Sequence, residues 1–91
     1  PVYIIIQEKD FIINDIWPIR RNIDTISGIR LNGFTNKLRI AFSGQSDLIF
    51  NTEEFKKDDL TELIYTLRGL CQHEIMITEN MIDKDRIGNI R

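Results

Sequence analysis

The alternation of apolar and polar positions predicts a β-strand at the start of the chain. Residues 2–7 are β-branched or aromatic at nearly every position, so both faces of this strand are apolar. Such a strand is either covered on both sides or paired with another chain. Polar residues 8–10 interrupt the pattern, and residues 11–13 then continue the strand or pair with it.

The isoleucine spacing that follows predicts a first helix. Isoleucines recur at intervals of three, four and three residues between Ile16 and Ile26, which gives a single apolar stripe. Asp15 is a suitable N-cap, and Pro18 falls in the first turn, where a missing N–H is tolerated. Gly28 then provides a C-terminal stop.

Three short alternating segments predict an antiparallel meander. These segments are residues 29–33, 37–43 and 47–51. In the middle segment, Leu38 and Phe42 point to one face of the sheet, because side chains alternate along a strand. Lys37 and Arg39 point to the other face. Glycine, asparagine and serine between the segments are typical of the tight turns that a meander needs.

A second helix has the clearest pattern in the chain. Its apolar residues fit the spacing i, i+3, i+4, i+7 and are Leu60, Leu63, Ile64, Leu67, Leu70 and Cys71. Asn51 with Glu54 is one possible N-terminal cap. Asp58 with Glu62 is the other. Gly69 inside the helix suggests a close approach to the sheet.

The final segments complete one domain of the α+β class. Residues 74–78 predict a last strand, and the polar tail 79–91 is either frayed or docked on a partner. The predicted order is β-α-β-β-β-α-β over residues 1–78. We therefore expect a mainly antiparallel sheet with two helices packed on one face.

The composition is that of an ordinary folded domain with an unusual choice of apolar residues. It is 42% hydrophobic and 29% charged, and no apolar run approaches the roughly 20 residues of a membrane span. We expect a cytoplasmic location and no membrane partner.

There are eighteen isoleucines against one valine and one alanine. Packing does not exclude valine or alanine, so the bias indicates an A/T-rich genome, such as that of a phage, a low-GC bacterium or a parasite.

Acidic residues gather at the start of the second helix. They are Glu53, Glu54, Asp58, Asp59 and Glu62. A helix N-terminus favours carboxylates in any case, and Lys56 and Lys57 dilute the negative charge. The alternative is that these acids form a contact surface for another protein. The tighter loop of a magnesium or calcium site is missing from this segment, so no metal is expected.

Basic residues are concentrated in the first half of the chain. Residues 1–46 carry four acids and six bases, and residues 47–91 carry ten acids and six bases. The candidate basic surface consists of Arg20, Arg21, Arg30, Lys37 and Arg39. A basic sheet face with an aromatic beside it is typical of single-stranded nucleic-acid binding, and an ordinary solvated face is the other interpretation.

Few residues offer catalytic chemistry. Cys71 is expected as a small core residue, and His73 is not expected to face it, because positions i and i+2 diverge on a helix. Trp17 is expected to cap the core rather than to contact a partner. No glycine-rich phosphate loop and no nucleophile with an evident base occurs in the sequence. We therefore expect neither an enzyme nor a cofactor.

The sequence favours a small non-enzymatic domain that binds another protein. Its size and codon bias suggest a phage or mobile-element accessory factor that inhibits a host enzyme or a defence nuclease, which would place it in the host cytoplasm. The alternative is a nucleic-acid-binding module that uses the basic sheet face. The doubly apolar segment Tyr3–Ile6 also predicts a homodimer, because pairing would hide an exposed edge.

Overall fold

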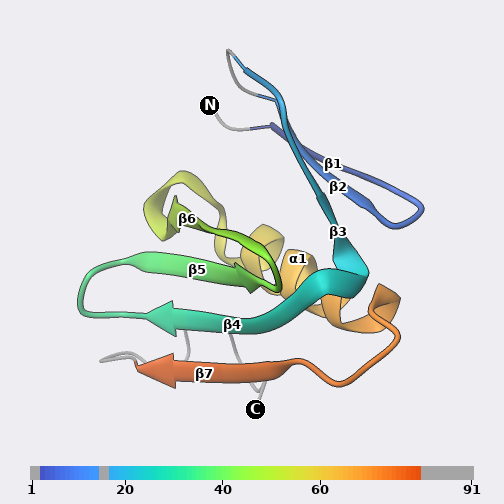
Figure 1. Ribbon diagram of the computed structural model, residues 1–91. Helices are drawn as coiled ribbons and strands as arrows, with labels where there is room; N and C mark the ends of the chain where they lie inside the picture. Colours follow the sequence, from blue (N-terminus) through green and yellow to red (C-terminus); the bar gives the residue numbers. More distant parts are fainter. Residues whose placement is uncertain (1–2, 15–16, 81–91) are drawn as a thin grey trace.

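A computed structural model describes residues 3–14 and 17–80 and has the α+β class expected from the sequence (Figure 1). Seven strands, two 3-10 turns and one α-helix occur in these ranges. In chain order they are β1 (Tyr3–Gln7), β2 (Asp10–Asn14), β3 (Ile19–Asn22), η1 (Ile23–Thr25), β4 (Ile26–Asn32), β5 (Lys37–Phe42), β6 (Gln45–Asn51), η2 (Thr52–Glu54), α1 (Lys57–Leu70) and β7 (Met76–Asn80).

The strands form two sheets instead of one. Strands β1, β2 and β3 make an antiparallel three-stranded sheet, and a second sheet has the order β6-β5-β4-β7. Ile4 faces Ile13 and Ile6 faces Phe11 across β1 and β2, so residues 11–13 pair with the first strand. In the second sheet β4 pairs antiparallel with β5 and parallel with β7.

The predicted first helix is wrong. Its three described isoleucines, Ile19, Ile23 and Ile26, lie in β3, in η1 and at the start of β4, and Ile23 and Ile26 are fully buried. Isoleucine is β-branched and loses side-chain freedom in a helix, so an isoleucine stripe is equally suited to strands. Gly28 is not a helix stop; it follows a bulge in β4. Asp15 and Ile16, at the predicted start, lie outside the described residues.

The second predicted helix is confirmed as α1, with corrections at both ends. Leu60, Ile64 and Leu67 are its buried residues. Its N-cap is Lys56, which makes no side-chain capping bond, whereas Asn51 caps η2 by accepting from the Glu53 N–H. A Cβ atom at Gly69 would meet nothing within 4 Å, so this glycine does not allow a close approach to the sheet.

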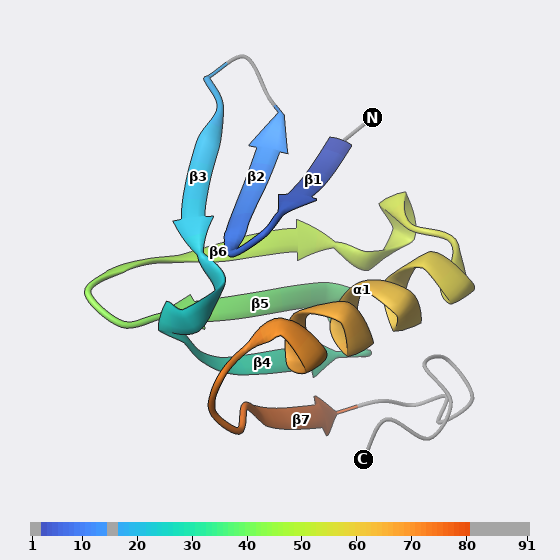
Figure 2. The same cartoon turned by 90° about the vertical axis from the view of Figure 1, so that its right-hand side faces the viewer.

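Both α1 and the three-stranded sheet lie over the same face of the four-stranded sheet (Figure 2). This face carries the buried residues Leu38 and Ile40 of β5, as the alternation predicts. Phe11 of β2 meets Phe50 of β6 edge to face, with ring centroids 6.3 Å apart. The two sheets and the helix therefore share a single hydrophobic core.

The last strand begins two residues later than predicted and includes two residues assigned to the tail. Ile75 is buried immediately before β7, and β7 runs parallel to β4 from Met76 to Asn80. The rest of the predicted tail, residues 81–91, lies outside the described residues. Within residues 3–14 and 17–80, none of the helices combines the length and the apolar character that crossing a bilayer requires.

Candidate functional site

A groove of about 430 Å³ separates β1 from the first half of α1. Its apolar lining comes from β1, from the segment before α1 and from α1 itself. These residues are Ile4, Ile6, Phe55 and Leu63. Each of these four side chains is half-buried and packs against the edge of the hydrophobic core. The groove is therefore an accessible extension of the hydrophobic core and not a separate cavity.

The backbone on both sides of the groove is fixed by core contacts. Phe55 packs its ring edge to face against Phe50 at 6.0 Å, and its N–H donates to the Thr52 carbonyl. On the opposite side, Ile4 and Ile6 lie on the inner face of β1, because they pair with the buried residues of β2. The apolar floor is thus held by ordered strands and turns on both sides.

The groove divides the predicted acidic set. Glu54, Asp59 and Glu62 line it, whereas their neighbours Glu53 and Asp58 do not. All five side chains are exposed. Glu53 instead accepts a hydrogen bond of 2.8 Å from the Asn36 side chain. Three carboxylates therefore stand beside an apolar floor, and none of the described residues that line the groove is basic.

The strand at the edge of the groove is apolar on both faces, as the sequence predicts. Tyr3 and Ile5 point away from the core and are 60% and 42% exposed. Trp17, in the connection between β2 and β3, is 82% exposed, so the prediction that it caps the core is wrong. Within the described residues β1 is an edge strand with a single neighbour, β2.

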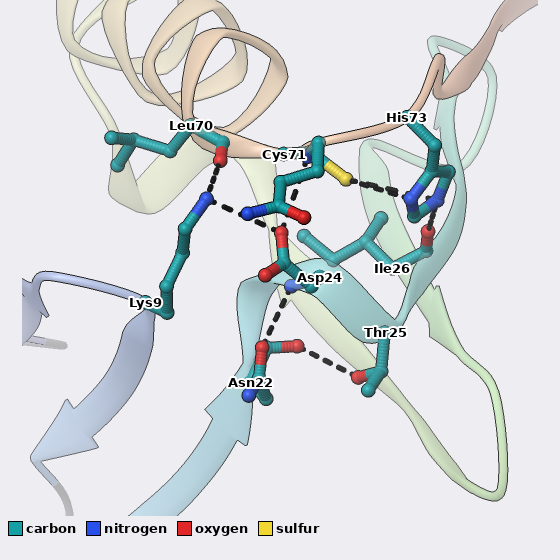
Figure 3. Close-up of polar contacts among 9 residues, drawn as sticks. Lys9, Asn22, Asp24, Thr25, Ile26, Leu70, Cys71 and His73 are labelled. Atoms are coloured by element: carbon teal, nitrogen blue, oxygen red, sulfur yellow. Dashed lines mark hydrogen bonds and ion pairs between the residues drawn. The ribbon is translucent and has the colours of Figure 1, made fainter.

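A network of polar contacts ties the β1–β2 turn to the end of α1 (Figure 3). The Lys9 ammonium donates to the Leu70 carbonyl and lies 3.3 Å from the Asp24 carboxylate. The Gln72 N–H donates to the same carboxylate oxygen at 3.2 Å. A cation is favoured at a helix C-terminus, where carbonyls lack helical partners. This Lys9 clamp holds β1 against α1 at the end of the strand nearest the turn.

Cys71 and His73 are in contact, although the sequence analysis predicted that they would not face each other. The rule that i and i+2 diverge does not apply, because α1 ends at Leu70. His73 Nε2 lies 2.7 Å from the Ile26 carbonyl, which can only accept, so Nε2 carries the proton. The other ring nitrogen, Nδ1, lies 3.3 Å from the Cys71 sulfur, within hydrogen-bond distance (Figure 3). The contact fastens the loop before β7 to the start of β4.

The basic set is only partly brought together. Arg30, Lys37 and Arg39 line a hollow of about 520 Å³ on the open face of the four-stranded sheet, opposite the core. Ile49, 53% exposed, lies in the same hollow, and Arg39 is paired with Asp47 at 3.3 Å. This confirms the predicted alternation of the sheet.

The other two arginines are on different surfaces. Arg20 is paired with Asp10 at 3.0 Å on the outer face of the three-stranded sheet. The Arg21 guanidinium lies 5.7 Å from the centre of the Phe42 ring and donates to the Ser46 hydroxyl. The five basic residues therefore do not form a single binding surface. The chain matches no protein-family model, no curated protein and no solved structure.

Proposed function

We propose that this protein is a non-enzymatic domain that binds another protein through the groove between β1 and α1. The observation that carries the proposal is the combination of an accessible apolar floor with three carboxylates beside an edge strand. An exposed apolar surface rimmed by polar groups is typical of protein interaction sites. A protein partner would cover the floor and meet the carboxylates at its edge, as in the polar rim of known interfaces.

Two neighbouring aspartates allow a matched test. Asp58 and Asp59 are both exposed in the first turn of α1, but only Asp59 lines the groove. We expect affinity capture with the full chain to recover a stoichiometric partner from a lysate of the source cell or its host. Asp59→Lys should reduce this recovery, and Asp58→Lys should leave it unchanged. Capture of no stoichiometric partner contradicts the proposed function, and equal recovery with both variants contradicts the site.

The finer proposal is an accessory factor of a phage or mobile element that inhibits a host enzyme or a defence nuclease in the cytoplasm. The isoleucine bias and the small size of the domain support it. An inhibitor of this kind needs a shaped and charged surface but no catalytic residues. Loss of the captured enzyme's activity on addition of the pure protein is the expected result.

A homodimer is a separate proposal, supported by the outer face of the three-stranded sheet. Tyr3, Ile5 and Trp17 are exposed there or beside it, and a second copy would bury them. Sedimentation at about 100 μM should show a dimer, since association depends on concentration. The double change Tyr3→Ser and Ile5→Ser should return the protein to a monomer. A monomeric wild-type protein at this concentration contradicts the proposal.

Nucleic-acid binding is a second candidate, favoured by the hollow that Arg30, Lys37 and Arg39 share. Counterion release predicts that such binding weakens steeply between about 50 and 200 mM salt. Against it, none of the described residues that line this hollow is aromatic, and stacking on aromatic rings is the usual support for single strands. Absence of binding to DNA and RNA at low salt would exclude this candidate.

A further inference from the structure

We infer that the partner binds as an extended segment that adds a strand to the free edge of β1, with lysine or arginine side chains directed into the groove. This inference rests on the proposed function and specifies the chemistry of the partner. It follows from three properties of the same place: the edge of β1, the apolar floor beneath that edge, and the carboxylates beyond the floor.

The edge of β1 presents backbone groups in the right positions. A two-residue turn joins Gln7 to Asp10, and these two residues face each other at the base of the hairpin. In such a hairpin the residues flanking the turn exchange hydrogen bonds, and every second residue along the strand does the same. The intervening residues, Ile4 and Ile6, therefore turn their N–H and C=O groups away from β2. An incoming strand would bond to these two residues.

The floor of the groove suits the long stems of basic side chains. Ile4 and Ile6 point their side chains into the groove, so alternate side chains of an added strand would lie over the same floor. Lysine and arginine cover apolar surface with their methylene groups and keep their charged ends outside. The ends would then reach the carboxylates of Glu54, Asp59 and Glu62, which lie on the opposite side of the floor.

Charge distinguishes this occupant from a second copy of the chain. Residues 3–7 carry no basic residue, so a second β1 would bring no cation to the three carboxylates. Lys9, the first base after this strand, is already bound to Asp24 and Leu70. A second copy on the outer face of the sheet, as proposed above, leaves the groove and the edge free.

Amide hydrogen exchange of the full chain tests the inference directly. The probe is an end-blocked octapeptide of alternating valine and lysine, and the control is the same peptide with glutamate in place of lysine. We expect the valine–lysine peptide to slow exchange of the Ile4 and Ile6 amides at least about 10-fold, because strand addition gives them hydrogen-bond acceptors. The amides of Tyr3, Ile5 and Gln7, which face β2, should change less. The glutamate peptide should have no effect.

The matched aspartate variants add a second measurement. Asp59→Lys should weaken binding of the valine–lysine peptide at least about 5-fold, and Asp58→Lys should change it less than about 2-fold. The inference is overturned if neither peptide protects the two amides, if both do so equally, or if the amides are already protected in the free chain. If capture of a partner depends on Asp59 but the partner leaves these amides unprotected, only the inference of strand addition is contradicted. The proposed function would then remain.

Discussion

The two sheets of this protein use their faces in different ways. In the four-stranded sheet, apolar residues such as Leu38 face the core, and charged residues such as Arg39 face outward. In the three-stranded sheet, Ile4 faces the core side and its neighbour Ile5 is exposed on the other side. Alternation of apolar and polar residues along a strand therefore indicates which face packs on the core. A strand without this alternation has apolar side chains on both faces, and the face away from the core stays exposed.

The largest effect should come from the core face of the four-stranded sheet. Ile40→Ala removes a fully buried side chain from the centre of that face and should lower the free energy of unfolding by about 2–5 kcal/mol. The matched change Ile49→Ala, on the neighbouring strand but on the open face, should alter it by less than about 0.5 kcal/mol. Urea unfolding of both variants measures the difference, and equal losses would contradict the assignment of the two faces.

A smaller contrast is expected in the three-stranded sheet. Ile13→Ala, on the inner face, should destabilise the protein by about 2–3 kcal/mol because Ile13 is almost completely buried. Ile5→Ala, on the outer face, should cost less than about 1 kcal/mol, since the side chain is already partly solvated. If Ile5→Ala proves as damaging as Ile13→Ala in thermal unfolding, a second chain already covers the outer face.

The joint between the three-stranded sheet and α1 depends on the Lys9 clamp. Lys9→Met keeps most of the stem but removes the charged donor to Leu70 and Asp24, and should destabilise the domain by about 1 kcal/mol. The variant should also loosen the groove, so binding of the valine–lysine peptide should weaken. Arg20→Met is the control, because it breaks an exposed pair on the outer face. Unchanged binding with Lys9→Met would show that the groove does not need the clamp.

Two of the hairpin turns, one from each sheet, should respond to substitution in opposite directions. Gly44, in the β5–β6 turn of the four-stranded sheet, has φ of 79°, so Gly44→Ala should destabilise by about 1 kcal/mol. Glu8, in the β1–β2 turn of the three-stranded sheet, has φ of 55°, which is unfavourable for a residue with a Cβ atom. Glu8→Gly should therefore stabilise by a few tenths of a kcal/mol. Thermal melting of both variants tests the signs, and a loss of stability with Glu8→Gly would contradict this conformation.

The sequence predicted the parts of the fold in which periodicity has one interpretation. The strand predicted at residues 37–43, which is β5 (Lys37–Phe42), has alternating apolar residues, and the helix through Leu60, Ile64 and Leu67 has the repeat of an α-helix. The stripe from Ile16 to Ile26 failed because the same spacing can place isoleucines on one side of a helix or in successive strands. Packing of Ile19, Ile23 and Ile26 into the shared hydrophobic core selects the second arrangement.

The groove could be predicted only in part. The sequence identified the acidic residues, but only some of them line the groove. Which of the neighbours Asp58 and Asp59 lines it depends on where β1 packs against α1, and the sequence pattern does not show that position. The Cys71–His73 contact was missed because it depends on where α1 ends. The apolar segment Tyr3–Ile6 was the sequence signal for the strand that borders the groove.

The parallel pairing of β4 with β7 has a consequence for folding during synthesis. Within residues 3–14 and 17–80, every other strand pair joins strands that are consecutive along the chain, and such local pairs are expected to form before a long-range one. β7 follows α1 in the chain and reaches β4 across two strands and that helix. Until β7 pairs with it, β4 has one unpaired edge, and an unpaired strand edge is a template for pairing with another chain, so slow docking of β7 would prolong this exposure of β4.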